Sequence, residues 1–591
     1  MFDWKAFHLQ LSEAYSQSKK FRESESHLER EIAFQRDDGI RTVIETRERQ
    51  TAQQVHQNLT TEFPDIAWQL TRLFPGAEEE DRLSESLDLA RFWLLKIPGL
   101  SIRELGQNPY DLAYLLRDQL DLASADPDIP FTENNDDENP PPAEIVGTCA
   151  MDRAWSLRAM RVPEAWEFSE RKGQPPQGRG ILIGHPDTGW TEHNDLDFGR
   201  LAKAIGWNFI DGNGNAIDPL DYRGNPSHGT ATGSVIMSGG TVEHPPTFGE
   251  GGTGAPGKVT GVAPQSTLVP IRTVRKVWWV FSSHLAQAIF HARMKGCHVV
   301  SISLGGRGFR HLRAALLDAV KHNVIVVAAA GNYFPLVVYP ARYPACIALA
   351  ATNCDHSPWI GSTCGPEVAI SAPGENVWRA YRTGLISHDC LAGPSSGTSY
   401  ATANTAGVAV LWLAHYGRNE LINMANGIPL QDLFRAALTE SARRVSGLDK
   451  DLFGAGIVDA RCLLEISITS PHVPQKLTAG RSQCLADLHQ RQRNIDLAQA
   501  HNLISDQDID LGNQVLTRLI NADIDHLSDM FEHFGPEIVN ILFDLKMARH
   551  SVLRKETLDR NMAQFVDSLR REICQRASVQ LRKYLQCPHP E

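Results

Sequence analysis

The sequence predicts an α/β protein in which a mainly parallel central sheet is flanked by N-terminal and C-terminal helical regions. Near-continuous apolar runs alternate with helical stretches, as in parallel strands that are covered on both faces. An acidic, proline-rich run precedes this region, and apolar residues return to helical spacing after it. The predicted strands are residues 181–184, 268–271, 298–302, 324–328 and 345–349.

Length and composition limit the classes of protein to consider. The chain has 591 residues, more than one hydrophobic core usually serves, so we expect several domains. Its 42% hydrophobic and 22% charged residues are typical of an ordinary globular protein. A net charge of -12 does little to attract nucleic acid or an anionic membrane surface, and no apolar stretch has the length of a bilayer span. We therefore expect neither nucleic acid nor a membrane as a partner.

The N-terminal part divides into three predicted segments. Residues 1–80 carry apolar residues at helical spacing and are expected to form a helical region. Residues 81–131 are expected to form a small unit, with a strand that ends at Pro98 and a helix that opens at Asn108. Residues 132–150 combine like charge with a proline run, which predicts an exposed linker.

The rest of the chain divides into two predicted domains. Residues 151–470 contain the α/β pattern, and residues 471–591 are expected to form a helical C-terminal domain. In this last part apolar side chains recur at helical spacing. They are Leu516, Leu519, Ile520, Ile524, Leu527, Phe531, Ile538, Ile541, Leu542 and Leu545.

The first residues and the cysteines bear on the cellular compartment. The chain starts without a basic segment followed by an apolar run, so we expect no signal peptide. The sequence contains no Cys-x-x-Cys pair, and a reducing cytoplasm is the expected location. Cys354, Cys364 and Cys390 lie in one loop-rich stretch and could pair in an exported protein, which keeps that alternative open.

Three segments carry residues suited to nucleophilic catalysis. Asp187 ends a predicted strand, His228 begins a helix of small residues, and Ser399 lies at the start of an apolar helix. A serine hydroxyl is a poor nucleophile at neutral pH and needs a base and a group that orients the base. Since ligands of open α/β sheets bind beyond the carboxyl ends of the strands, we expect these three side chains to meet there.

With this order of Asp, His and Ser, residues 180–460 resemble the catalytic domain of the subtilase family of serine peptidases. The resemblance implies a subtilisin-like three-layer fold and peptide-bond hydrolysis through an acyl-enzyme on Ser399. It implies that Asn332, in the run Ala-Ala-Gly-Asn, donates to the oxyanion. It also implies a substrate-binding edge formed by Ser303, Leu304, Gly305 and Gly306. No organic cofactor is required; structural calcium is common in the family, but no ligands can be matched in this chain.

The sequence departs from the usual subtilase pattern at two places. His185 and Pro186 stand where an apolar pair usually precedes the acid, which could disturb the strand or change the environment of Asp187. Ala403 and Asn404 stand where the family has Pro-His, so the helix after the nucleophile is braced differently.

The flanking segments suggest regulation. Residues 86–131 resemble a subtilase prodomain, and we hypothesise that this unit inhibits the enzyme until the chain is cut between about Phe131 and Met151. The alternative is an adaptor that is never removed. Residues 1–80 and 471–591 are expected to bind a protein partner, mediate self-association or gate a protease acting on protein or peptide substrates.

Other functions have less support. A catalytically weak subtilase-fold scaffold, acting through its helical flanks, is the main alternative. Residues 252–258 approach a phosphate-binding loop, but Val259 stands where a metal-binding Ser or Thr is needed. His284, His291 and His298 recur every seven residues but lack carboxylate or cysteine company, so a zinc site is a weak interpretation.

Overall fold

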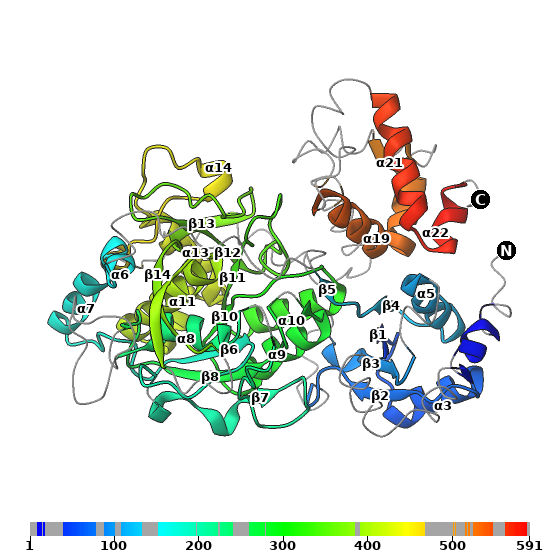
Figure 1. The fold of residues 1–591 in the computed structure, drawn as a ribbon, viewed down its shortest axis with the longest axis horizontal. Helices are drawn as coiled ribbons and strands as arrows, with labels where there is room; N and C mark the ends of the chain where they lie inside the picture. The colour runs from blue at the N-terminus through cyan, green and yellow to red at the C-terminus, as the bar shows by residue number, and fades with distance from the viewer. Residues whose placement is uncertain are drawn as a thin grey trace. The chain divides into compact units, whose positions relative to one another are not determined.

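The structure is a computed structural model, and it falls into two compact units (Figure 1). The terminal unit contains residues 1–129, 308–311 and 483–591, and the central unit contains residues 130–307 and 312–482. The described residues are 39–77, 88–100, 108–132, 152–196, 198–222, 225–239, 259–277, 279–383, 390–466, 524–547 and 562–587, with a few single residues and short runs near residues 7–17, 468 and 500–519.

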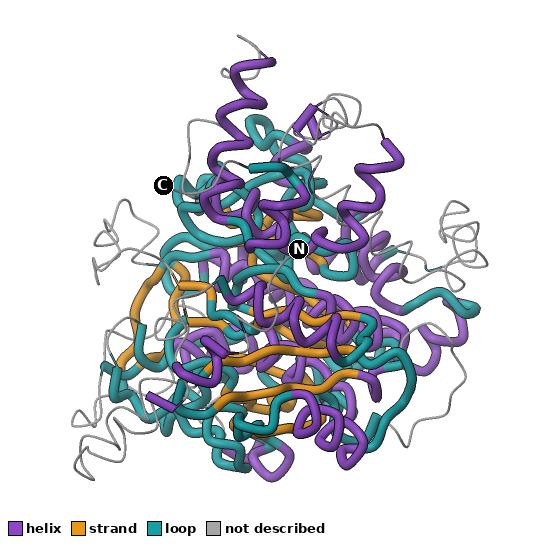
Figure 2. Tube along the Cα trace, turned by 90° about the vertical axis from the view of Figure 1, so that its right-hand side faces the viewer, coloured by secondary structure: helices purple, strands orange, loops and turns teal. Residues whose placement is uncertain are grey.

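A seven-stranded sheet forms the centre of the central unit, in the order β13-β12-β11-β10-β6-β8-β7. All neighbouring strands are parallel, and the strands lie side by side in Figure 2. The predicted α/β fold class is confirmed, and the five predicted apolar runs correspond to β6, β8, β10, β11 and β12. The strands are β6 (Leu182–Asp187), β7 (Trp207–Asn208), β8 (Thr267–Arg272), β10 (Val299–Ile302), β11 (Ile325–Ala329), β12 (Ile347–Thr352) and β13 (Val368–Pro373).

Helices cover both faces of this sheet. Successive side chains of a strand point to opposite faces. On β6, Ile183 belongs to the apolar cluster around helix α11 (Thr398–Tyr416), whereas the next residue, Gly184, faces Ala292 of helix α9 (Ser282–Met294). The other α-helices among the described residues of the unit are α6 (Trp155–Ala159), α7 (Val162–Arg171), α8 (His228–Met237), α10 (Arg310–Lys321, in this unit from Leu312), α12 (Arg418–Ala425), α13 (Leu430–Glu440), α14 (Lys450–Phe453) and α15 (Ala460–Glu465).

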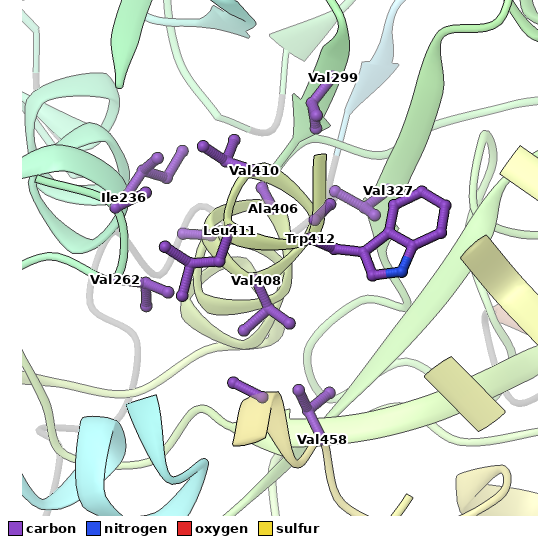
Figure 3. Close-up of a cluster of buried hydrophobic side chains, with 14 of the residues drawn as sticks. Ile236, Val262, Val299, Val327, Ala406, Val408, Val410, Leu411, Trp412 and Val458 are labelled. Carbon is purple, nitrogen blue, oxygen red and sulfur yellow. The ribbon is translucent and has the colours of Figure 1, made fainter. Parts of the chain in front are cut away.

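Helix α11 is the centre of the core. Every residue from Thr398 to His415 is buried, as expected for a helix that is apolar on all sides. Figure 3 shows its side chains pointing outward in several directions, toward Ile236 and Val262, toward Val299 and Val327, and toward Val458. The helix therefore has a fixed position, and so has the residue at its N-terminus.

Two short antiparallel ladders lie outside the central sheet. One pairs β14 (Val377–Tyr381) with β15 (Leu391–Ser395). The other pairs β5 (Phe131–Thr132) with β9 (Trp279–Val280). The second ladder joins the start of the predicted linker to the central unit.

The terminal unit begins with an antiparallel sheet in the order β2-β3-β1-β4. The strand β3 and the helix α5, with Asn108 as its N-cap, agree with the sequence prediction. The prediction of a purely helical region for residues 1–80 is wrong: Val43 and Ile44 lie in β1, where burial on both faces removes the alternating pattern of a strand. The elements are β1 (Ile40–Glu45), α3 (Ala52–Glu62), β2 (Gln69–Arg72), β3 (Phe92–Ile97), α5 (Pro109–Gln119) and β4 (Ser124–Pro127).

This sheet crosses the boundary expected after residue 80, because β1 and β2 pair with β3. The C-terminal helices α19 (Ile524–Met547), α21 (Met562–Arg576) and α22 (Val579–Tyr584) belong to the same unit as residues 1–129. The two ends of the chain thus fold together, rather than as the three separate segments that the sequence suggested.

The cysteines differ from the expectation. Cys574 and Cys587 form a disulfide at the end of the terminal unit, and Cys354 is also disulfide-bonded. Cys364 and Cys390 are free thiols, so the three cysteines of the loop-rich stretch do not pair with one another. None of the described helices combines the length and the apolar character needed to cross a membrane.

Candidate active site

Asp187 and His228 reach each other because a strand end and a helix start come unusually close. Asp187 is the last residue of β6, and His228 is the first residue of α8. A Cβ on Gly229 would lie 2.1 Å from the carbonyl oxygen of Gly189, so only glycine permits this approach. The small residues that follow the histidine therefore bring the imidazole to the carboxylate.

The Asp187 carboxylate is fully buried and accepts a hydrogen bond from the His228 ring. Nδ1 of His228 lies 2.8 Å from Oδ1 and 3.0 Å from Oδ2, and the backbone N–H of Thr188 donates to Oδ1 at 2.7 Å. Burial alone would raise the pKa of Asp187, but the charge and hydrogen bond of His228, with smaller help from His185 and Thr188, lower it. An ionised carboxylate in this position favours the tautomer with the proton on Nδ1, which leaves a lone pair on Nε2.

Ser399 lies in the first turn of α11 at the carboxyl end of β10. Its hydroxyl donates to the carbonyl of Ser303 at 3.4 Å, and the Ser303 hydroxyl donates to the carbonyl of Ser399 at 3.1 Å. Among the described contacts, the Ser399 hydroxyl makes no hydrogen bond to His228. Such a bond is often long without substrate and tightens in the reacting complex. The strand beside β10 is β6, so Ser399 lies at the same edge of the sheet as Asp187.

Asn332 lies beside the start of α11 with its side chain oriented by Thr398. Its Oδ1 accepts from the backbone N–H of Thr398 at 2.9 Å and from the Thr398 hydroxyl at 2.8 Å. Both donors fix the amide with its oxygen toward the helix, so the NH₂ group is left for another partner. That nitrogen lies 3.4 Å from the position of a Cβ on Gly397, two residues before Ser399. The sequence motif identified Asn332 but gave no sign of the role of Thr398.

Asp218 braces the segments next to Asp187 and His228 and was not found from the sequence. Its Oδ2 accepts from the Thr188 hydroxyl at 2.7 Å and from the backbone N–H of Ser227 at 3.1 Å. The Thr188 hydroxyl in turn accepts from the N–H of Gly229 at 3.1 Å. This buried carboxylate therefore ties the residue after the acid to the residue before the histidine. A lone aspartate in a loop has no motif that would have identified it.

The unusual His185 is buried near the Asp187 carboxylate. Its Nε2 lies 3.0 Å from the Thr232 hydroxyl, which is 3.4 Å from Oδ2 of Asp187. Burial lowers the pKa of His185, which favours the neutral ring. The expected disturbance of the strand is absent, because β6 keeps its parallel register with β8 through Asp187. His185 does change the environment of Asp187, by adding a polar chain through Thr232.

The helix after Ser399 keeps its form without the usual proline. Helix α11 is continuous from Thr398 to Tyr416, and the amide of Asn404 donates to the carbonyl of Pro373 at 2.9 Å. This hydrogen bond braces the helix against the end of β13.

The predicted substrate edge follows β10 directly. Gly306 pairs with Tyr339, its N–H donating at 2.7 Å to the Tyr339 carbonyl. A Cβ on Gly305 would lie 2.2 Å from the Val338 side chain, so this stretch runs close to a neighbouring loop. Ser303 faces Ser399 as described above, and Leu304 is buried.

Phe131 of β5 packs on this edge. Its Cβ lies 3.2 Å from the position of a Cβ on Gly306, and its ring meets that of Phe334 edge-on at 5.9 Å. The Phe131 side chain is only 7% exposed, and the carbonyl of Pro130 accepts from Arg307 at 3.1 Å. The last residues of the predicted unit 81–131 therefore cover part of the predicted substrate edge.

The described residues contain no group of three or more His, Cys, Asp or Glu side chains placed to hold a metal ion. His291 contacts the carbonyl of Ile205 at 2.8 Å, and His298 accepts from the N–H of Leu182 at 3.2 Å. These two histidines are bonded to the backbone instead of converging on a zinc site. The glycine-rich run 252–258 lies outside the described residues.

Comparison with known proteins relates this chain to one family of serine peptidases. The sequence profile of the subtilase family matches residues 178–456. Thermitase from Thermoactinomyces vulgaris is 30% identical over 299 residues, which are 50% of this chain and 90% of thermitase. M-protease from Shouchella clausii is 28% identical over 334 residues, covering 55% of this chain and 76% of that protein. The crystal structure of MycP1 with its N-terminal propeptide removed aligns with 53% of this chain and 97% of its own, at 23% identity and a TM-score of 0.40.

Proposed function

Because this chain belongs to the subtilase family of serine endopeptidases, we propose that it hydrolyses peptide bonds with Asp187, His228 and Ser399 as its triad and Asn332 as its oxyanion donor. The observation that carries this assignment is the hydrogen bond from the His228 ring to the buried Asp187 carboxylate. This hydrogen bond lies at the same edge of the sheet as Ser399, which is in the first turn of the buried helix α11.

In the proposed reaction, Nε2 of His228 takes the proton of the Ser399 hydroxyl as the oxygen attacks the substrate carbonyl. Asp187 keeps the imidazole in the required tautomer and stabilises the imidazolium that forms. The backbone N–H of Ser399 and the side-chain NH₂ of Asn332 stabilise the oxyanion. His228 then protonates the leaving amine, and water releases the acyl group by the reverse steps. These steps need no organic cofactor.

Reaction with a fluorophosphonate probe tests the assignment. We expect the mature, folded protein to be labelled at Ser399, because the phosphorus atom is attacked by an activated serine oxygen. Peptide mapping of the labelled protein identifies the modified residue. A folded protein that stays unlabelled would favour the scaffold alternative, and a label on another serine would contradict the assignment.

The Asn332→Ala variant should lose about 10²- to 10³-fold in kcat with little change in KM, a loss measured for the oxyanion-hole asparagine of a subtilisin. Thr398→Val should also lower kcat, but less, because it removes one of the two donors that orient the Asn332 amide. Steady-state kinetics on a peptide substrate measure both effects. Thr405→Val, in the interior of α11, serves as a matched control. A change mainly in KM for Asn332→Ala would contradict the oxyanion role.

We further propose that residues 86–131 act as an inhibitory prodomain whose end lies on the substrate edge. The pairing of β5 with β9 and the contact of Phe131 with Gly306 support this proposal, because subtilase substrates bind as extended strands. With Phe131 in place, a substrate side chain could not occupy the same position beside Gly306. Cleavage in the linker would free this edge.

N-terminal sequencing of the purified protein tests the processing step. For the wild type we expect a new N-terminus between about Phe131 and Met151. The Ser399→Ala variant should stay intact if the cut is made by the protein itself. An intact chain in both preparations would favour the permanent adaptor.

The cytoplasmic location remains a prediction. The disulfide between Cys574 and Cys587 and the disulfide at Cys354 favour an oxidising compartment, because such bonds rarely persist in a reducing cytoplasm. The protein or peptide substrate follows from the family.

A further inference from the structure

The two ends of the chain are held together by contacts within the terminal unit, although more than 400 residues separate them in sequence. We propose that the N-terminal fragment stays bound to helices α19, α21 and α22 after the linker is cut. Cleavage would then produce a two-chain enzyme instead of releasing a prodomain. The physiological meaning rests on the proposed processing, but the binding itself can be tested without it.

Helix α5 meets helix α19 through polar groups that are buried. The Tyr114 hydroxyl donates to Oε2 of Glu537 at 2.9 Å, and the Asn540 amide donates to the Tyr110 hydroxyl at 2.9 Å. Glu537 is fully buried, and the exposed fractions of Tyr114 and Asn540 are each 3%. Burial raises the pKa of Glu537 to about 7, although hydrogen bonds from Ser578 and Tyr114 oppose this shift.

Separation of the two helices would leave these groups without their partners. Most buried polar groups in proteins are hydrogen-bonded, because losing a partner costs more than making the bond gains. The ring of Tyr114 also meets that of Phe534 edge-on at 5.4 Å. The contact therefore has the apolar and polar components of a protein core rather than of a transient surface.

The N-terminus of α5 contacts the turn between α21 and α22. The Asn108 amide donates to the carbonyl of Arg576 at 2.8 Å. The backbone N–H of Val579 donates to the buried carboxylate of Asp111 at 2.9 Å. Ser578, between them, donates through its hydroxyl to Glu537 at 2.9 Å. The turn between α21 and α22 is thus hydrogen-bonded both to α5 and to Glu537 of α19.

The disulfide Cys574–Cys587 encloses this turn. The two cysteines are 13 positions apart in sequence, and Arg576, Ser578 and Val579 lie between them. The disulfide lowers the conformational entropy of this turn when α5 is not bound. Binding of α5 therefore costs less entropy. We therefore expect the oxidised protein to hold the N-terminal fragment more tightly than the reduced protein.

A single cut within residues 134–142 leaves no covalent path from the N-terminal fragment to the rest of the molecule, because the chain has no cysteine before Cys149. The C-terminal helices remain joined to the central unit through the chain after residue 466. Retention of the fragment then depends on non-covalent contacts. Those with the C-terminal helices lie within the terminal unit, whereas Phe131 and Thr132 contact the central unit through the pairing of β5 with β9.

The experiment uses the full chain with Ser399→Ala and the recognition site of an unrelated protease in place of part of residues 134–142. After complete cleavage, we expect the fragments to co-elute in equal amounts on gel filtration and to separate in urea. Elution of the N-terminal fragment as a separate, folded species would overturn the proposal. Since another protease makes the cut in an inactive variant, the result does not depend on the proposed catalysis or processing.

Point variants identify the contact that holds the fragment. Glu537→Ala and Tyr114→Phe in the cleavable chain should each speed dissociation of the fragment at least tenfold, and reduction of the disulfide should speed it as well. Asp567→Asn, at an exposed position on α21, is the matched control and should leave the rate unchanged. A chain that ends at Ser482 should release the fragment on cleavage. If the truncated chain and the two point variants retained the fragment as well as the full cleavable chain does, other contacts would hold the fragment. That result would refute the proposal.

Discussion

The Ser399→Ala variant is expected to lose about 10⁶-fold in kcat, the loss measured when the nucleophile of a subtilisin is removed. Without the hydroxyl no acyl-enzyme forms, and His228 has no proton to accept. The residual rate should come from substrate positioning and the oxyanion donors alone. Hydrolysis of a chromogenic peptide ester and of the matching amide measures the loss for two leaving groups.

The Ser399→Ala variant should fold normally, because alanine suits the first turn of a buried helix. Ser395→Ala, at the end of β15, provides a control on a neighbouring serine and should keep its activity within about twofold. If Ser399→Ala retained more than a hundredth of the wild-type rate, the hydrolysis would have to come from another nucleophile or from a contaminating enzyme.

Much of the central unit could be predicted because its signals are local. Five apolar runs gave five parallel strands, since strands that are buried on both faces contain few polar residues. The glycines and small residues around Asp187, His228 and Ser399 were recognisable because close backbone approach admits little else, as Gly229 illustrates.

The terminal unit could not be predicted in the same way because its contacts are non-local. Val43 and Ile44 were compatible with a helix until β3 and β4 were known to lie on either side of them. Nothing near Tyr114 indicates that its hydroxyl binds Glu537, and neither residue belongs to a motif. Pairing between distant segments depends on shape and burial that short-range patterns do not encode.

In the candidate site, too, some residues could be predicted from local sequence and others depend on contacts between distant segments. Asn332 was identified from its motif, but the orientation of its amide depends on Thr398, which comes from another part of the chain. Asp218 hydrogen-bonds Thr188 and Ser227, the neighbours of Asp187 and His228, whereas the Thr232 hydroxyl contacts Asp187 itself. The positions of Asp218 and Thr232 follow only from the fold. Motifs thus locate the groups that would react, whereas the structure locates the groups that position them.

The second large effect is expected for Asp187→Asn, which should lower kcat about 10⁴-fold, as the equivalent change does in trypsin-like enzymes. The backbone N–H of Thr188 donates to Oδ1, so the asparagine should keep its oxygen on this donor. Its NH₂ group would then face Nδ1 of His228, where Oδ2 lies 3.0 Å away in the wild type. A donor at this position requires an unprotonated Nδ1, and the ring proton moves to Nε2. In that tautomer His228 cannot accept the proton of Ser399, although the shape of the site is unchanged.

Kinetics and ring NMR together test this explanation. The ¹⁵N shifts of His228 should show the proton on Nδ1 in the wild type and on Nε2 in Asp187→Asn, with KM nearly unchanged. Glu192→Gln, at an exposed position shortly after Asp187, removes a carboxylate without touching the ring and should leave both tautomer and rate unaltered. A large loss of activity with the proton still on Nδ1 would mean that Asp187 acts mainly through its charge. A loss below tenfold would mean that the carboxylate is not what orients the base, and His185 and Thr232 would then be the next groups to examine, since they form the other polar chain that ends at Asp187.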